Sequence, residues 1–186
     1  MSRICLVGIG LPSLVAGSSH CGPGLRSGHF AGALAEAGHD VLLLYLDQAA
    51  VAGASLADAQ TIAPGVLVLA APEPDFVPGS LATVAQDFGA SALVGCTAYG
   101  SSLALRLELG LPTWADLMGD LMAAAQAKAA LLGDDSCLLH FWSLLRPVLP
   151  GADRSSAVSQ APAVSQVGQL GLARMPSSSP SVACSL

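Results

Sequence analysis

Charge is scarce in this sequence, since charged residues make up 11% of its 186 residues and the formal net charge is −6. Lys128 is the single lysine, and the six arginines are scattered along the chain. No basic stripe is present that could track a phosphate backbone, so nucleic acid is not an expected partner. The five cysteines are odd in number and form no C-x-x-C pair. This spacing favours buried free thiols over a disulfide framework or a zinc site.

Long uninterrupted apolar runs are also absent. Asp120, Lys128, Asp134, His140 and Arg146 interrupt the most apolar region well before it reaches the length that spans a bilayer. The first residues turn into glycine and proline too quickly for a signal peptide with a cleavage site. These features predict a cytoplasmic protein with at most peripheral membrane contact.

What the sequence does contain is apolar residues, at 53% of the chain, arranged in short runs. The runs 3–9 and 40–46 show no alternation of polar and apolar residues, which suits strands covered on both faces, and a helical pattern lies between them. Such a unit opens a doubly wound domain. We therefore expect an α/β fold, Rossmann-like, with a mostly parallel sheet of about six strands and helices on both faces. The strands are expected at 3–9, 40–46, 66–71, 91–96, 111–114 and 154–159.

Helices are expected between these strands, with Ser27 capping the first and Gly38 closing it. The others are expected at about 54–60, 80–88, 103–109, 121–132 and 161–170, together with one that starts near Ser136 and is stopped by Pro147 and Pro150. That last helix is apolar almost all round, which predicts self-association or weak membrane adhesion. Residues 1–172 are expected to form one domain, and the Ser/Pro-rich segment 173–186 is expected to be a disordered tail.

The first candidate site is the glycine-rich loop from Gly8 to Arg26, because ligands of such folds bind at the carboxyl ends of strands. Its end, Gly22-Pro-Gly-Leu-Arg26, places a forked donor beside flexible backbone, which suits an anion or a hydroxyl; the alternative is a turn with a solvated arginine. The opening Gly8-Ile-Gly10 only begins a dinucleotide fingerprint, because Ser13 stands at the third glycine position. No cofactor is therefore expected. His20 and Cys21 lack a second pair at ligand spacing, so no metal is expected either.

Two further candidates follow later strands. The small polar stretch that holds Thr97 and Tyr99 comes after the fourth expected strand and is predicted to be a turn. Asp116 and Asp120 follow the fifth. Asp116 could orient a sugar hydroxyl or act as a general base, or else cap the next helix, and the residues alone leave this open. For Asp120 a helix cap is the favoured role.

In order and spacing, these residues resemble the amino-terminal half of GT-B glycosyltransferases of the family 4 type. The resemblance is carried by Gly22-Pro-Gly-Leu-Arg26, by Ala35-Glu-Ala-Gly-His-Asp-Val41 and by Leu111-Pro-Thr-Trp-Ala-Asp-Leu-Met-Gly-Asp120 with Ala125-Gln-Ala-Lys128. It continues through 152–160 and 168–171, so that it covers the chain to about Ala173.

The resemblance implies a domain that binds a sugar, lipid or polysaccharide acceptor, while a second domain binds the nucleotide sugar. Implied substrate-binding residues are His20, Gly22, Gly24, Arg26, Thr97 and Tyr99, and the implied catalytic residue is Asp116. No donor-binding domain is recognised in the sequence, so we expect a truncated acceptor-side half that is inactive without such a partner. The alternatives are a noncatalytic Rossmann-like binding module or fragment, and a nicotinamide-dependent oxidoreductase.

Overall fold

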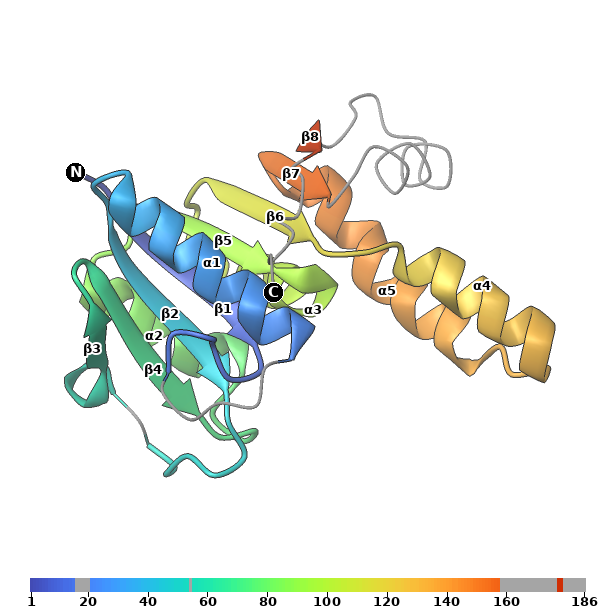
Figure 1. Ribbon diagram of the computed structural model, residues 1–186, viewed down its shortest axis with the longest axis horizontal. Coiled ribbons are helices and arrows are strands. Elements are labelled where there is room, and N and C mark those ends of the chain that lie inside the picture. Colours follow the sequence, from blue (N-terminus) through green and yellow to red (C-terminus); the bar gives the residue numbers. More distant parts are fainter. Residues whose placement is uncertain (16–20, 54, 158–176, 179–186) are drawn as a thin grey trace, which may run out of the picture.

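The computed structural model describes residues 1–15, 21–53, 55–157 and 177–178, and Figure 1 shows their arrangement. Their strands form one sheet in the order β3-β4-β2-β1-β5-β6-β7-β8. Every neighbouring pair is parallel except β3 and β4. The strands are β1 (Arg3–Ile9), β2 (Asp40–Leu46), β3 (Gln60–Ala63), β4 (Val66–Ala71), β5 (Ala92–Cys96), β6 (Thr113–Leu117), β7 (Arg154–Ala157) and β8 (Ser177–Ser178).

Helices cover both faces of this sheet (Figure 1). One face packs on α1 (Gly22–Glu36), and its core contains Leu6, Leu43 and Ala31. The other face packs on α2 (Pro78–Phe88) and α3 (Thr97–Leu105), and its core contains Val7 and Leu81. The central residues of β1 and β2 are thus buried on both sides, as the lack of alternation predicted. The predicted Rossmann-like α/β fold is confirmed.

Two helices begin earlier than the sequence predicted. The helix α1 starts at Gly22, so Ser27 is no cap but an interior residue, whose hydroxyl donates to the Gly24 carbonyl at 3.1 Å. Pro23 explains the early start, because proline in the first turn has a suitable φ and lacks an N–H that would go unused there. The helix α3 starts at Thr97, where a turn and then a helix from 103 were expected. A single residue, Thr97 with φ of 71°, makes the whole change of direction.

The region between β2 and β4 also differs from the expectation. The helix expected at 54–60 is a single turn, η1 (Leu56–Asp58), in which Ser55 and Asp58 form a reciprocal capping box. The antiparallel strand β3 was missed, since its four residues are too few for a period to stand out. The strand β6 begins two residues later than expected and extends to Leu117. Asp116 therefore lies inside a strand.

The helices α4 (Leu121–Leu132) and α5 (Ser136–Gly151) form a hairpin that extends away from the sheet (Figure 1). Asp120 caps α4 by accepting from the Ala123 N–H at 2.9 Å, and Gly133 ends it with φ of 66°, as predicted. The prediction that Pro147 and Pro150 stop α5 is wrong for Pro147, since the helix contains both prolines and ends at Gly151, directly after Pro150. The last turns persist because Leu145, Val148 and Leu149 are buried against the sheet and α3.

In the part of the chain that the structure describes, no helix combines the length and apolar character that crossing a membrane requires. The helix expected at 161–170 lies outside the described residues. Within the segment expected to be a disordered tail, Ser177 and Ser178 pair with Ser156 and Ala157 of β7.

Candidate functional site

The direction of the strand order changes between β1 and β5, since β2 and β4 continue on one side and β6 and β7 on the other. In doubly wound sheets, ligands bind at the carboxyl ends of the strands beside this point. The glycine-rich loop follows β1 there, and the junction of β5 with α3 follows on the other side. The candidate residues from the sequence come from these two connections and from β6.

Arg26, in the second turn of α1, crosses to Asp116 on β6 and pairs with it in a two-pronged contact. Its Nε donates to Oδ2 and its Nη2 donates to Oδ1, both at 2.8 Å. The Asp116 side chain is fully buried, and that of Arg26 is 13% exposed. Hydrogen bonding to Asp116 raises the pKa of the guanidinium above its ordinary value, which outweighs the opposing effect of its burial. The pair ties the first helix to the sixth strand with the planar geometry that arginine and carboxylate share.

Two residues extend this pair into a network. The Ser156 hydroxyl on β7 donates to Asp116 Oδ1 at 2.7 Å, and the Trp114 indole N–H donates to the Ser156 hydroxyl at 2.9 Å. Phe30 of α1 meets the Trp114 ring edge to face, with centroids 5.2 Å apart, and the Arg26 guanidinium lies over the Phe30 ring. One chain of contacts therefore joins α1, β6 and β7 at the carboxyl edge of the sheet.

This geometry bears on the two roles left open for Asp116. It does not cap a helix, because it is a strand residue and Asp120 occupies the cap position of α4. As a general base it would need a lone pair facing a substrate. Both of its oxygens accept hydrogen bonds from Arg26, one of them also from Ser156, and the side chain is inaccessible to solvent. The hydrogen bonds of Asp116 therefore suit a positioning role, in which the carboxylate holds Arg26 and the start of α1 in place.

Gly22 and Gly24 lie beside the pair, at the start of α1. Gly24 is buried against the Leu11 carbonyl so closely that any Cβ at this position would collide with it. A side chain at Gly22 would approach the Met118 methyl group to 3.1 Å. The glycines thus let the loop after β1 close over the helix start, next to the residues that follow β6.

Thr97 is buried, and its left-handed φ is uncommon for a β-branched residue. It follows Cys96, which pairs with Asp116 across β5 and β6. Tyr99 lies apart from this network: it is 40% exposed, and its hydroxyl pairs with His140 Nε2 of α5 at 2.7 Å. Of the predicted residues, the structure therefore brings Gly22, Gly24, Arg26 and Asp116 together, with Thr97 adjacent to them.

His20 lies outside the described residues. Among the described residues, no group of three His, Cys, Asp or Glu side chains is placed to hold a metal ion.

Sequence reasoning missed Ser156, Trp114 and His140. Ser156 sits in a four-residue strand with no pattern around it, and its contact with Asp116 joins positions 40 residues apart. Trp114 could have been recognised from the sequence, because a tryptophan in a buried strand needs a hydrogen-bond partner for its indole N–H.

The sheet order and the helices on both of its faces define a Rossmann-like α/β domain. Among solved structures, this chain is similar to sucrose-phosphate synthase from Thermosynechococcus elongatus, with a TM-score of 0.61 and 14% sequence identity. The match covers 97% of this chain and 47% of that one, so the chain spans about half the length of the structure it matches. No family model matches the sequence, and no curated protein matches it.

Proposed function

We propose that this chain is the amino-terminal, acceptor-binding half of a GT-B glycosyltransferase of the family 4 type, which transfers a sugar from a nucleotide sugar when a donor-binding domain faces it. The observation that carries the proposal is the structural similarity to sucrose-phosphate synthase over 97% of the chain. The resemblance of three sequence stretches to family 4 supports it independently. We place the protein in the cytoplasm, where nucleotide sugars are made.

In this proposal the acceptor lies at the carboxyl ends of β1, β5 and β6, against Gly22, Gly24 and the peptide groups around Thr97. Asp116 acts by fixing Arg26 and the start of α1 rather than by moving a proton. Its burial and its three hydrogen bonds support this role. The Tyr99 ring, 40% exposed on α3, lies apart from this network with its hydroxyl paired to His140, so we give it no direct contact with the acceptor in this proposal.

The test combines the purified chain with a separately expressed donor-binding domain of a GT-B glycosyltransferase. Release of nucleotide from UDP-glucose or GDP-mannose is measured with a panel of sugar, lipid and polysaccharide acceptors. We expect release only when both halves and an acceptor are present, and loss of release in Arg26→Ala. Asp134→Asn, which alters an exposed ion pair far from the rim, is the matched control. Absence of release with every acceptor and donor would argue against a split enzyme.

A noncatalytic binding module is the second candidate, and the buried state of Asp116 favours it, because the network leaves no carboxylate oxygen of Asp116 open for catalysis. A module should melt cooperatively in circular dichroism and calorimetry and should release no nucleotide in the assay above. Tight binding of a nicotinamide cofactor in a titration would instead support an oxidoreductase.

A further inference from the structure

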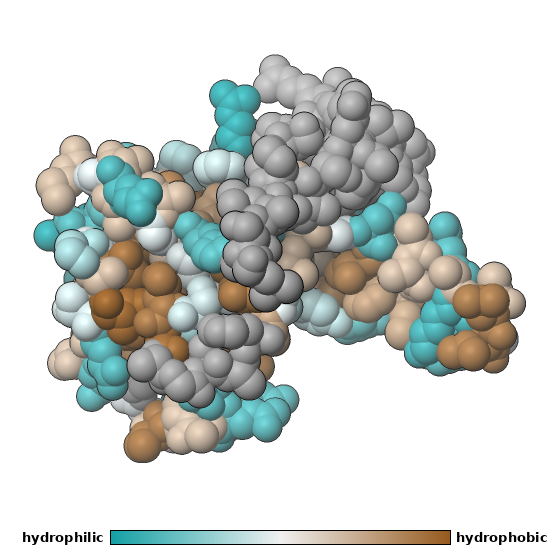
Figure 2. All heavy atoms as spheres, viewed as in Figure 1, coloured by the Kyte–Doolittle hydropathy of each residue, from teal (hydrophilic) through white to brown (hydrophobic). Residues whose placement is uncertain are grey.

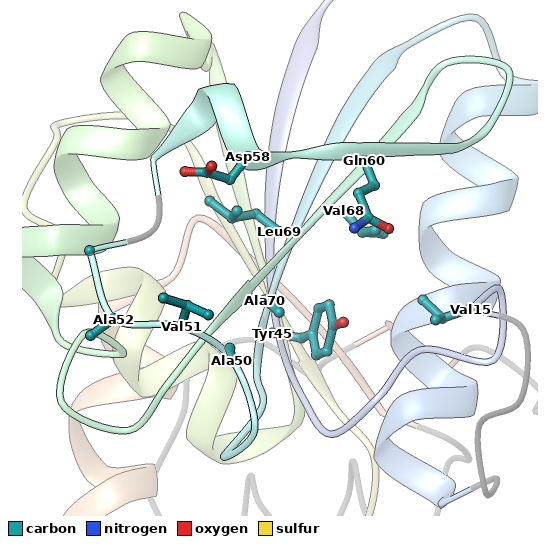
Figure 3. A pocket seen from close by; sticks show the side chains of 11 residues that line it. Val15, Tyr45, Ala50, Val51, Ala52, Asp58, Gln60, Val68, Leu69 and Ala70 are labelled. Atoms are coloured by element: carbon teal, nitrogen blue, oxygen red, sulfur yellow. The ribbon is translucent and has the colours of Figure 1, made fainter.

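A cavity of about 460 Å³ lies at the outer edge of the sheet (Figure 3), and none of the residues that line it belongs to the Arg26 network. The end of β2, the end of β4, the start of β3 and the loop 50–53 surround it, and Val15 closes one side. Polar and apolar atoms contribute about equally to its exposed lining, and Val15, Val68 and Leu69 are among the apolar side chains. The volume lies within the range of sites that hold small molecules.

The sheet edge inside the cavity carries main-chain groups that no strand occupies. The Val41 N–H donates to the Gly65 carbonyl and the Asp47 N–H donates to the Ala71 carbonyl, so the main-chain N–H and C=O groups of odd-numbered residues in and beside β4 point toward β2. The main-chain groups of even-numbered residues therefore point away from β2, toward β3. Val68 is one of these residues, and it pairs with Gln60, the first residue of β3. Ala70 is the next outward residue, and β3 does not reach it. No described residue pairs with its N–H or C=O, so within the described part of the chain these groups are a donor and an acceptor at the cavity wall.

Two side chains add polar groups to this wall. The Tyr45 side chain is buried, and no hydrogen bond joins its hydroxyl to another described residue. Burial, with a smaller contribution from Asp47, raises the pKa of this hydroxyl, so it stays protonated and can donate. The Gln60 amide, drawn at the rim of the cavity in Figure 3, offers a further donor and acceptor.

Charge decides which ligands the cavity can take. Asp58 is the only charged residue among those that line it, and none of the described lining residues is basic. The Asp58 carboxylate already accepts from the N–H and hydroxyl of Ser55. A phosphate or carboxylate would find no cation here and would face an acidic neighbour, so an anion is disfavoured.

We propose that this cavity binds a small, neutral molecule that combines an apolar part with an amide-type group, whose donor and acceptor pair with the Ala70 main chain, Tyr45 and Gln60. The site is separate from the rim of β1, β5 and β6, and it does not depend on glycosyl transfer.

The experiment titrates the full chain into N-(4-fluorophenyl)acetamide, a neutral probe with one amide, and follows line broadening by ¹⁹F NMR. A probe of this size should bind with a Kd on the order of 1 mM. The anion 4-fluorobenzoate should bind at least about tenfold more weakly, because the cavity offers no cation.

Variants locate the probe. Gln60→Trp places an indole in the cavity mouth and should abolish binding, whereas Thr61→Trp, the next residue on the opposite face of β3, should leave it unchanged. Ala52→Trp blocks the cavity from the exposed loop and should act like Gln60→Trp. Tyr45→Phe should weaken binding about fivefold through the loss of one hydrogen bond.

Several results would overturn the proposal: no binding by the unaltered chain up to 10-fold above the expected Kd, equal binding of the anion, or full binding by both Gln60→Trp and Ala52→Trp. The readout contains no sugar and no donor domain. A failure here therefore leaves the proposed function standing, and a failure of nucleotide release leaves this site standing.

Discussion

Replacing Asp116 by asparagine should destabilise the protein far more than a one-atom change suggests. Asp116 accepts from Arg26 at both oxygens and from Ser156 at Oδ1. If the asparagine oxygen takes the Oδ1 position, its NH₂ group meets the Arg26 Nε–H, which is also a donor. The reverse orientation sets the NH₂ group against Nη2 and the Ser156 hydroxyl, which both donate to Oδ1 in the unaltered chain. Either way, at least one hydrogen bond becomes a contact between two donors, and the guanidinium loses its counter-charge.

The magnitude follows from burial. Removing one partner of a buried ion pair costs about 3–5 kcal/mol, and the 13% exposure of Arg26 favours the lower end of that range. For a chain of this length, about 3 kcal/mol corresponds to a fall in Tm of roughly 6–12 °C. Arg26→Met should cost more than Asp116→Asn, because it leaves the fully buried carboxylate without its cation.

The assay is a double-mutant cycle measured by urea titration and thermal melting, with Asp116→Asn, Arg26→Met and the double variant. A coupling free energy of about 2–3 kcal/mol is expected, with the double variant more stable than the sum of the single effects predicts. Asp134→Asn is the matched control, since its pair with Lys128 is 39–42% exposed and screened by water, and its Tm should barely change. Additive effects, with a coupling below about 0.5 kcal/mol, would refute the reasoning.

Three shorter predictions concern other parts of the chain. Thr97→Gly should raise the free energy of unfolding by up to about 1 kcal/mol in urea titration, because relief of a left-handed backbone outweighs the added entropy of glycine; a clear loss of stability would contradict this. Burial raises the pKa of the Cys5 thiol to about 12. An unfolded thiol ionises near pH 9, so the unfolded state binds fewer protons above that pH, and Tm should be steady below pH 9 and fall from there toward pH 12. Cys5→Ala should flatten that fall. Leu132 and Leu139 are 72% and 80% exposed on the α4–α5 hairpin, and their replacement by glutamate should lower self-association in light scattering. A strictly monomeric unaltered chain would count against this last prediction.

The parts of the fold that the sequence predicted are those with a strong local cause. After their first residues, Arg3 and Asp40, the runs 3–9 and 40–46 show no alternation of polar and apolar residues, which is typical of a strand buried on both faces. The prediction that Arg26 and Asp116 lie at one rim is confirmed, because parallel strands bring their carboxyl ends to one edge and each residue follows or ends such a strand. The roles assigned to them remain proposals.

The parts that could not be predicted depend on contacts between distant residues. Whether α1 starts at Gly22 or after Ser27 depends on how the loop after β1 packs on Gly24, which involves Leu11. The start of α3 depends on one backbone angle, at Thr97. Ser156 has no local signal, and its place in the network exists only once β7 pairs with β6.

The positive charges available at the two proposed sites indicate which kinds of ligand each site can bind. A nucleotide sugar carries a diphosphate, and proteins hold such groups with guanidinium or ammonium groups or with helix N-termini. At the described rim, the guanidinium of Arg26 is already neutralised by Asp116 through two hydrogen bonds. The edge cavity has no basic lining residue among those described. Among the described residues, the two proposed sites therefore offer a phosphate helix N-termini and no guanidinium without a counter-charge. Under the proposed function, we expect the cations for the donor's phosphates to come from the donor-binding domain.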